Sequence, residues 1–289
     1  MIEKSELILN RDGSIFHLHL KPENIADRII LVGDQARVDT ISGFFSSIDF
    51  SIQNREFKTV TGWYNTKKLS VISTGIGTDN IDIVMNELDA LANIDFKKRE
   101  IKAQKKSLEI VRIGTSGGLQ DDLPVNSWVL SEKSIGFDGM LPFYKNYDQY
   151  CDTGFENAFR QFTGWKTTLP TPYVVNGSDE LISRFTDSAF CKGVTISAPG
   201  FYGPQGRILR LDLSMPKLNQ LIEKFSYNNL KITNFEMESS AIYGLSKMLG
   251  HQALTVCPII ANRVRKEANE NYRNQMKELV KNVLDLLTN

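Results

Sequence analysis

Apolar residues recur along the chain in short runs of the kind that form buried β-strands. Between many of these runs the apolar positions follow the three-to-four spacing of amphipathic helices, as at 37–45, 81–92 and 238–249. The same spacing places several C-terminal side chains on one helical face: Tyr272, Met276, Leu279, Val280, Val283 and Leu287. The strand-type runs are Arg28–Val32, Leu69–Ser73, Glu109–Ile113, Trp128–Leu130, Lys231–Phe235 and Leu254–Val256.

Strands that alternate with helices predict an α/β fold, with a largely parallel or mixed sheet covered by helices on both faces. The segment Ile48–Ser73 differs, because it contains successive strand patterns broken by a turn at Asn65-Thr66. It predicts an antiparallel excursion within the sheet. No internal repeat, low-complexity tract or Pro/Gly/Ser linker marks a boundary, so residues 1–289 are expected to form a single domain.

The overall charge is balanced. Basic and acidic residues both number 34, so no global field attracts nucleic acid or an anionic membrane. The basic run Lys97–Lys106 contains no aromatic residue, and it is interpreted as a solvated helix end or surface insertion rather than a nucleic-acid patch. The longest apolar stretch, Ala253–Ala261, is too short to cross a bilayer. The N-terminus lacks the apolar run of a secretory signal, so a cytoplasmic protein is expected.

The chain contains three widely spaced cysteines, Cys151, Cys191 and Cys257. An odd number at such spacing fits reduced, buried thiols better than disulfides or a metal cluster. No histidine or acid pairs with any of them by motif, which disfavours a catalytic cysteine.

Glycine-rich turns follow three of the predicted strands. Ligands of open α/β sheets bind beyond the carboxyl ends of strands, where free amide groups favour anions. A single turn of this kind is most often only a tight connection, so charged partners are needed to strengthen the case. The three turns are Val32-Gly-Asp34, Ser73-Thr-Gly-Ile-Gly77 and Gly114-Thr-Ser-Gly-Gly118.

Three arginines lie near these turns. Arg37 follows Gly33 by about one helical turn, Arg55 lies where two strand patterns meet, and Arg112 stands within an apolar strand. A buried guanidinium needs a compensating charge, so Arg112 indicates either a bound anion or a salt bridge to a carboxylate. The P-loop and dinucleotide glycine motifs are both missing from the sequence, which favours free phosphate over a nucleotide tail.

Two further clusters suit the other parts of a nucleoside. The segment Phe201–Arg207 supplies an aromatic ring, an amide and a guanidinium, which together can stack on a nucleobase and hydrogen-bond to it. The alternative for this segment is a Gly-Pro surface turn. Glu236 and Glu238 flank Met237 where a strand meets a helix, and their carboxylates can accept hydrogen bonds from sugar hydroxyls. A glutamate at a helix start is also stabilised by the helix dipole, whatever its function.

With these motifs the chain resembles the uridine phosphorylases of the nucleoside phosphorylase superfamily along nearly its whole length. The matching segments, in order, are Val32–Arg37, Arg55–Phe57, Ser73–Gly77, Arg112–Gly117, Phe201–Arg207 and Phe235–Ser239. The resemblance implies a three-layer α/β/α nucleoside phosphorylase fold with a central mixed, partly barrel-like β-sheet. It also implies phosphorolysis of uridine to uracil and ribose 1-phosphate.

The resemblance further implies a role for each matching residue. Ribose would be held by Thr115, Met237 and Glu238, and by His17 from a neighbouring subunit. Phosphate would be bound by Gly33, Arg37, Arg112 and Thr115 of one subunit and by Arg55 of the neighbour. The base would meet Gly117, Phe201, Gln205, Arg207 and Arg263. The residues expected to act in catalysis are Arg112, Gln205, Arg207 and Glu238.

Sites shared in this way make a homodimer the smallest active unit, and relatives commonly assemble dimers into hexamers. Without the resemblance, His17 would be interpreted as an ordinary strand or loop histidine. Phosphate is a co-substrate, and no metal or other cofactor is expected. Some members of the family hold a monovalent cation with a glutamate that corresponds to Glu56, but here Asn80 replaces the expected serine ligand. Gln35 likewise stands where a proline is frequent in the family.

The choice of base is predicted from Asn262. Purine phosphorylases of similar fold carry an aspartate in the segment that corresponds to Ile259–Arg263, and this aspartate helps to protonate the purine. An amide cannot act as that acid, so uridine is expected over inosine or adenosine. The alternatives are phosphorolysis of another nucleoside (deoxyuridine, thymidine or a purine nucleoside), a nucleoside hydrolase, and a nucleoside-binding protein without turnover.

Overall fold

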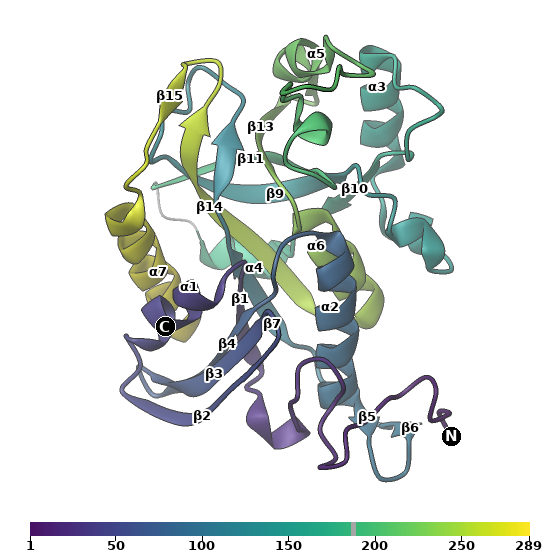
Figure 1. Ribbon diagram of the computed structural model, residues 1–289, viewed down its shortest axis with the longest axis vertical. Coiled ribbons are helices and arrows are strands. Elements are labelled where there is room, and N and C mark those ends of the chain that lie inside the picture. Colours follow the sequence, from purple (N-terminus) through teal and green to yellow (C-terminus); the bar gives the residue numbers. More distant parts are fainter. Residues whose placement is uncertain (186–188) are drawn as a thin grey trace.

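The computed structural model describes residues 1–185 and 189–289 (Figure 1). The predicted α/β fold is confirmed. Its main sheet runs through β10 (Tyr173–Asn176), β9 (Trp128–Gly136), β11 (Phe190–Ser197), β13 (Leu230–Glu236), β8 (Ser116–Gly118), β14 (Gln252–Asn262), β7 (Glu109–Ile113), β1 (Arg28–Val32), β4 (Lys67–Ser73), β3 (Phe57–Tyr64) and β2 (Ser47–Asn54). Two short strands pair in antiparallel register with members of this sheet: β12 (Ser226–Tyr227) with β13, and β15 (Glu267–Ala268) with β14.

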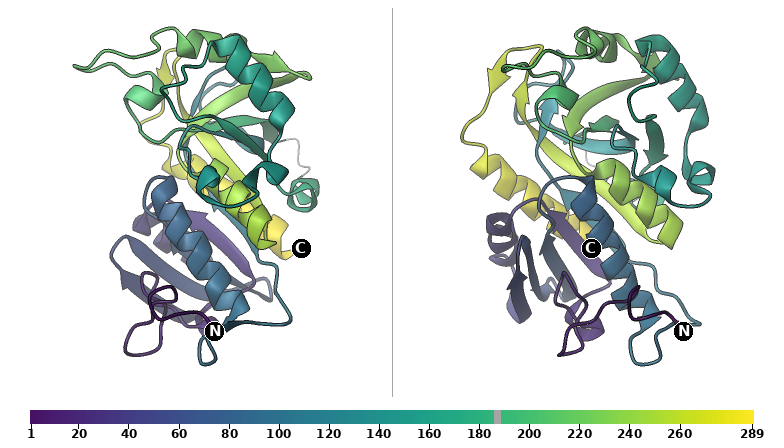
Figure 2. Two further views of the ribbon diagram at one scale, coloured as in Figure 1. Left: turned by 90° about the vertical axis from the view of Figure 1, so that its right-hand side faces the viewer. Right: turned by 45° about the vertical axis from the view of Figure 1, so that its right-hand side comes forward.

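Part of this sheet closes on itself. β9 pairs with β11, β11 with β13, β13 with β8, β8 with β14, and β14 returns to β9. The ring of five strands confirms the expected partly barrel-like sheet. It occupies one end of the molecule, and the open part of the sheet from β7 to β2 lies at the other end (Figure 2). β14 belongs to both parts, because Gln252–Val256 pair with β7 of the open sheet and Val256–Asn262 pair with β9 and β8 of the ring, so the two parts meet near the middle of β14.

Helices cover both faces of the open sheet. Successive side chains of β1 point to opposite faces, so Ile29 and Leu31 pack with α2 (Thr78–Asn93) and α6 (Ser239–Leu249). On the other face, Ile30 and Val32 pack with α1 (Gln35–Ser42), α4 (Asp179–Arg184) and α7 (Arg273–Thr288). The expected three layers are therefore present. The barrel end packs against α3 (Thr153–Thr163) and α5 (Leu218–Lys224).

The predicted antiparallel excursion is also confirmed. β2, β3 and β4 pair in antiparallel register, and β4 pairs in parallel with β1. Asn65 and Thr66 form the β3–β4 turn with φ of 45° and 66°. Arg55, in the turn between β2 and β3, has φ of 54°, a left-handed conformation that non-glycine residues adopt mainly in turns. The tight turn directs Arg55 outward at the tip of the hairpin.

Several elements extend beyond the sequence patterns. β9 and β14 are longer than predicted, and the segment from α3 through β11 was not predicted at all. The run Lys97–Lys106 belongs to a surface insertion after α2, in which β5 (Ile94–Asp95) and β6 (Glu100–Ile101) form a small hairpin. Single-turn 3₁₀ helices lie at Pro22–Asn24, Leu141–Phe143, Tyr147–Tyr150 and Gly203–Gln205.

The cysteines differ in part from expectation. All three are free thiols, but only Cys257 is buried, whereas Cys151 is half-buried and Cys191 is exposed. Cys191 lies near the start of β11, where it and the next residue are both exposed. In the part of the chain that the structure describes, no helix is both long enough and apolar enough to span a membrane.

Candidate active site

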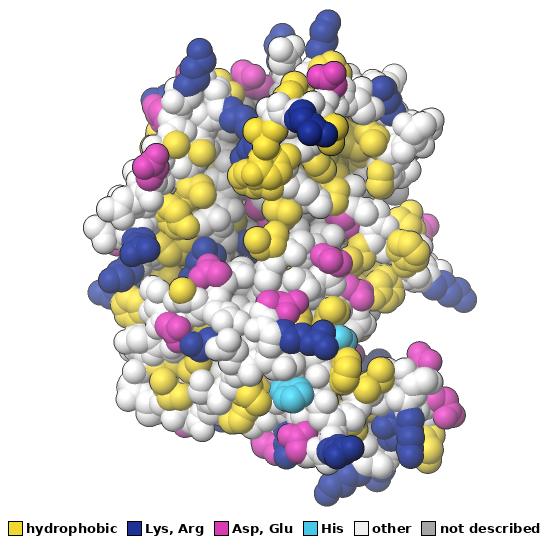
Figure 3. Space-filling model, viewed as in Figure 1, with side chains coloured by type: hydrophobic (Ala, Val, Ile, Leu, Met, Phe, Trp, Pro, Cys, Tyr) yellow, Lys and Arg dark blue, Asp and Glu magenta, His cyan; other side chains and the backbone are white. Residues whose placement is uncertain are grey.

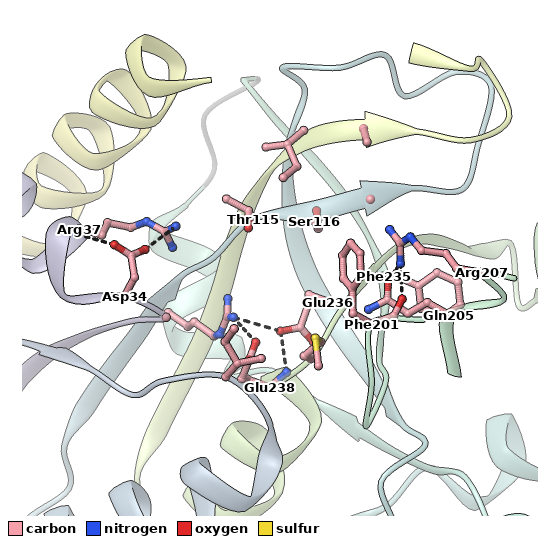
Figure 4. Close-up of a pocket in the computed structure, with 17 residues that line it drawn as sticks. Asp34, Arg37, Thr115, Ser116, Phe201, Gln205, Arg207, Phe235, Glu236 and Glu238 are labelled. Carbon is pink, nitrogen blue, oxygen red and sulfur yellow. Dashed lines mark hydrogen bonds and ion pairs between the residues drawn. The ribbon is translucent and has the colours of Figure 1, made fainter. Parts of the chain in front are cut away.

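A pocket of about 330 Å³ lies where the loops after β1, β7 and β13 meet (Figure 4). β1, β4 and β7 are parallel, so their carboxyl ends lie at one edge of the sheet and bring the glycine turns together. Ten of the predicted residues line this pocket: Gly33, Arg37, Arg112, Thr115, Gly117, Phe201, Gln205, Arg207, Met237 and Glu238.

Arg112 is the buried centre of this pocket. Its Nη2 donates a short hydrogen bond to Oε2 of Glu238 and lies 3.7 Å from Oε2 of Glu236. Burial opposes the charge of Arg112, but Glu238 and Glu236 outweigh it and raise the pKa of the guanidinium above its usual value. The sequence left open whether an anion or a carboxylate compensates Arg112. In the structure both candidate carboxylates contact it from one side.

The two carboxylates are held differently. Glu236 accepts hydrogen bonds from the backbone N–H groups of Glu238 and Ser239, each at 3.0 Å, at the beginning of α6. Oε1 of Glu238 accepts a hydrogen bond of 2.8 Å from the N–H of Gly77. Burial raises the pKa of Glu238, Arg112 opposes that rise, and the charge of Glu236 adds to it. The centre of the pocket therefore has one guanidinium for two carboxylates.

Arg37 lies at one end of the pocket, paired with Asp34. Asp34 begins α1, where its Oδ1 accepts a hydrogen bond of 2.9 Å from the N–H of Arg37. Its Oδ2 lies 2.9 Å from Nη2 of Arg37, and Nη1 of Arg37 donates to the carbonyl of Ile113 at 3.2 Å. The guanidinium is thus fixed between the first and third glycine turns. Beside it, the backbone of Gly33 faces the pocket without a side chain.

The opposite end of the pocket is formed by the Phe201–Arg207 loop. Cζ of Arg207 lies 3.6 Å from the centroid of the Phe201 ring, in cation–π geometry. Nη1 of Arg207 donates to Oε1 of Gln205 at 2.6 Å. Burial and the neighbouring Arg263 lower the pKa of Arg207 to about 10, so it keeps its charge at neutral pH. Three of the predicted base-binding side chains, Phe201, Gln205 and Arg207, therefore form one connected group.

Arg263 and Asn262 lie behind this loop. Nη1 of Arg263 donates to the backbone carbonyl of Gln205, so it supports the loop, and its contact with a base stays a prediction. The Asn262 amide nitrogen donates to the carbonyls of Gln120 and Leu123 at 2.8 and 2.7 Å. The Asn262 amide oxygen accepts from two backbone N–H groups, those of Val264 and Arg265. Asn262 is therefore fully used in holding loops together and does not line the pocket.

His17 and Arg55 do not line the pocket of their own chain, which is what residues serving a neighbouring subunit require. They lie close to each other, because Nδ2 of Asn54 donates to the carbonyl of His17 at 2.7 Å. Nε2 of Gln35 donates to the carbonyl of Arg55, also at 2.7 Å. Figure 3 shows exposed histidine side chains, with basic side chains beside them, on the viewed face of the molecule.

Seven further residues line the pocket, and of these the sequence gave a candidate role only to Glu236, as an acceptor for sugar hydroxyls. The signal for most of them was proximity to an assigned motif, since Asp34, Ser116, Phe235 and Glu236 directly adjoin or lie within one. Ile76, 67% exposed at the pocket edge, lies in the second glycine turn. Ile260 and Ala261 line the pocket because β14 continues beyond Val256, where the sequence pattern predicted its end.

Among the described residues, no group of three or more His, Cys, Asp or Glu side chains can hold a metal ion. Glu56 and Asn80 both lie beside Gly75, where an added β-carbon would stand 3.2 Å from Cγ of Glu56 and 2.5 Å from Nδ2 of Asn80. The two positions expected near a monovalent cation are thus adjacent, and the cation itself stays a prediction.

The order of these groups defines what the pocket can bind. Figure 4 shows Asp34 and Arg37 at one end, Glu236 and Glu238 in the middle, and Phe201, Gln205 and Arg207 at the other end. A guanidinium beside glycine backbone suits an oxyanion, buried carboxylates suit hydroxyl groups, and an aromatic ring with an amide and a guanidinium suits a flat polar ring. The order of these groups therefore suits an oxyanion, a sugar and a heterocycle in line.

Comparison with known proteins places the chain in a family. The sequence pattern of the phosphorylase superfamily matches residues 27–289. The chain belongs to this superfamily. A solved structure described as a Trypanosoma brucei nucleoside phosphorylase that shows uridine phosphorylase activity superimposes with a TM-score of 0.86 at 30% sequence identity, covering 98% of this chain and 99% of that one.

Two curated relatives illustrate the range of names among similar proteins. A uridine phosphorylase of Thermococcus kodakarensis is 27% identical over 276 residues, covering 92% of this chain and 85% of the relative. A DeoD-type purine nucleoside phosphorylase of Streptococcus suis is 25% identical over 277 residues, covering 94% of this chain and 98% of the relative. The expected nucleoside phosphorylase fold is confirmed.

Proposed function

We propose that this chain is a uridine phosphorylase, a pentosyltransferase that converts uridine and phosphate to uracil and ribose 1-phosphate. The observation that carries the proposal is the linear order of an arginine–glycine end, a carboxylate centre and an aromatic–amide–guanidinium end within one pocket. Relatives named uridine phosphorylase at 27% identity, and the structure with that activity at 30%, support the same assignment.

Phosphate would bind among Gly33, Arg37, Arg112 and Thr115. Its oxygen attacks the anomeric carbon while the bond to uracil breaks, and the developing positive charge on the sugar is opposed by the bound phosphate. No covalent bond to the protein forms. Because Arg112 already pairs with two carboxylates, its charge alone cannot offset a phosphate dianion, and the site needs further cations.

The neighbouring subunit would supply one of those cations. The Arg55 side chain is exposed, and among the described residues it has no hydrogen-bond or ion-pair partner. Its place at the hairpin tip beside His17 suits a residue that enters another subunit's pocket, with His17 at the sugar. We therefore propose a homodimer as the smallest active unit, with a hexamer as the larger assembly. We also propose that the chain is a single domain and that the enzyme acts in the cytoplasm, in pyrimidine salvage.

Ribose would lie over Met237, with its hydroxyls on Glu238 and Thr115. The departing uracil gains negative charge on its ring, and charge-assisted hydrogen bonds strengthen as that charge develops. Gln205 can pair with the imide edge of the base, while Arg207 stabilises a carbonyl oxygen directly or by polarising the Gln205 amide. Phe201 and Gly117 would contact the flat faces of the ring.

The test is uracil release from uridine with and without phosphate. Uridine phosphorolysis requires release that depends on phosphate and yields ribose 1-phosphate. Release that persists after phosphate is removed by dialysis would identify a nucleoside hydrolase instead. Inosine and adenosine serve as comparison substrates, because DeoD-type purine phosphorylases are also similar to this chain. Faster phosphorolysis of either purine nucleoside would overturn the assignment of uridine.

A further inference from the structure

Glu87, in the middle of α2, binds the His17 loop through several hydrogen bonds. Its Oε1 accepts from the backbone N–H of His17 at 3.0 Å, and its Oε2 accepts from the N–H of Leu18 at 2.8 Å. Nδ1 of the His17 ring lies 2.7 Å from the same Oε1. Glu87 is therefore bound to both the backbone and the ring of His17.

These contacts determine which ring nitrogen carries the proton. An ionised carboxylate only accepts hydrogen bonds, so the 2.7 Å contact requires a proton on Nδ1 of His17. In the neutral ring Nε2 then has a free lone pair and acts as an acceptor. Within residues 1–185 and 189–289, Nε2 has no hydrogen-bond partner, and the His17 side chain is 27% exposed. An acceptor is thus presented to the surface of the chain.

The position of the ring is fixed by further contacts. The Asn54 amide holds the His17 carbonyl at 2.7 Å, next to Arg55 in the β2–β3 turn. The Phe16 ring packs edge-on against the imidazole, with ring centroids 4.7 Å apart. Asn54 and Phe16 restrict where the ring lies, but among the described residues only Glu87 contacts a ring nitrogen. Position and tautomer are therefore set by different residues.

We propose that Glu87 is a positioning residue that keeps His17 in the Nδ1–H tautomer, so that Nε2 accepts a hydrogen bond from a ribose hydroxyl bound in the neighbouring subunit. This inference rests on the proposed function, because that function supplies the ribose. A hydroxyl is the matching ligand, since it donates a proton, whereas a phosphate ester at the same place offers only acceptors. At the position that Nε2 contacts, the arrangement therefore selects a free hydroxyl over a phosphate ester.

The tautomer can be measured without any enzyme assay. The chain contains three histidines, and His17→Asn identifies the His17 signals in ¹⁵N-resolved NMR spectra of the full-length protein. The wild type is expected to show a protonated Nδ1 and an unprotonated Nε2 at His17. Glu87→Gln should preserve this state, because the amide oxygen can still accept from Nδ1. A proton on Nε2 in the wild type would overturn the proposal.

The functional part is tested by a double-mutant cycle on kcat/KM for uridine. Glu87→Ala should lower kcat/KM about five- to tenfold, the effect of about one hydrogen bond, while KM for phosphate stays unchanged. In a His17→Ala background the same change should have little further effect, because Glu87 acts through His17. An equal loss in both backgrounds, with unfolding temperatures matched, would show a general structural role and refute the proposal.

Deoxynucleosides identify the hydroxyl and separate the two proposals. The wild type should have a lower kcat/KM for one of the three analogues, 2′-, 3′- or 5′-deoxyuridine, than for uridine. That loss should be similar to the loss that Glu87→Ala shows with uridine itself. Glu87→Ala should have similar kcat/KM values for that analogue and for uridine. If the variant separates the two substrates as strongly as the wild type does, the proposed role of Glu87 is wrong. If the wild type releases no uracil from uridine with phosphate, the proposed function fails, and the NMR spectra still decide whether Glu87 sets the tautomer.

Discussion

The guanidinium of Arg112 lies directly against Gly114, so that a β-carbon at residue 114 would stand 1.6 Å from Nη1 of Arg112 and 2.8 Å from Sγ of Cys257. No side chain fits in that space. Gly114→Ala is therefore expected to displace Arg112 and to lower kcat/KM for uridine about a hundredfold, the usual effect of misplacing a catalytic group by about 1 Å. Steady-state kinetics with uridine and phosphate measures this loss.

Gly33→Ala is the matched comparison for Gly114→Ala. A β-carbon at Gly33 would meet no atom closer than the carbonyl oxygen of Gly75 at 3.8 Å, an ordinary contact. Its methyl group should leave the free energy of unfolding within about 0.5 kcal/mol of wild type. Because Gly33 lines the pocket, the methyl should instead raise KM for phosphate. A loss of unfolding free energy in Gly33→Ala well above about 0.5 kcal/mol would contradict the inference that residue 33 has room for a methyl group.

The activity should show an acid limb set by Glu238. Burial raises the pKa of this carboxyl above its usual value, and only the ionised form can accept from both a ribose hydroxyl and Arg112. As the pH falls, Glu238 is therefore protonated earlier than an exposed glutamate, whose pKa is about 4.3. We expect kcat/KM for uridine to fall with an apparent pKa above that value.

Glu238→Gln provides the control for this pH profile. The amide cannot be protonated in this range, so the variant should be less active but should lack the same acid limb. Glu236, 3.7 Å from the guanidinium, remains to hold Arg112 in place. If the acid limb persists unchanged in Glu238→Gln, a group other than Glu238 causes it. Repeating the pH profile at saturating phosphate shows whether the limb comes from protonation of the phosphate co-substrate.

Local patterns and motifs in the sequence were sufficient to locate most of the pocket. Arg112 within an apolar strand required a charged partner, and the glycine turns had to meet because parallel strands end at one edge of a sheet. Contacts between distant segments could not be predicted in this way. The amide of Asn262 binds loops near residue 120, and Arg263 contacts Gln205 only through a carbonyl. Such contacts depend on loop geometry, which motif spacing does not encode.

The sequence alone linked Asn262 to the choice of base, whereas its contacts in the structure predict a role in stability. Asn262→Asp would place a carboxylate opposite the carbonyls of Gln120 and Leu123, which now accept hydrogen bonds from the amide. We expect a loss of about 1–3 kcal/mol in unfolding free energy, because buried acceptors are left unpaired. Phosphorolysis of inosine should not appear. Denaturant unfolding and an inosine assay check both parts, and efficient inosine cleavage by a stable variant would contradict this explanation.

Arg55 gives the sharpest test of a shared active site. Arg55→Ala and Arg112→Ala should each lower activity about a hundredfold or more as homo-oligomers, since each removes a cation from the phosphate site. The two variants are co-expressed with different affinity tags, and mixed dimers are purified through both tags. If Arg55 acts in the neighbouring subunit, each mixed dimer contains one intact site and one doubly damaged site.

The mixed dimers should then regain about half of the wild-type activity, because one of two equivalent sites is restored. Arg37→Ala combined with Arg112→Ala is the matched control. Both of these arginines line the pocket of their own chain, so each site in that mixture lacks one of them and no recovery is expected. Absence of recovery with Arg55→Ala would place Arg55 within its own subunit and remove the physical reason for an obligatory dimer. Recovery in the control would show that Arg37 and Arg112 do not serve the same site.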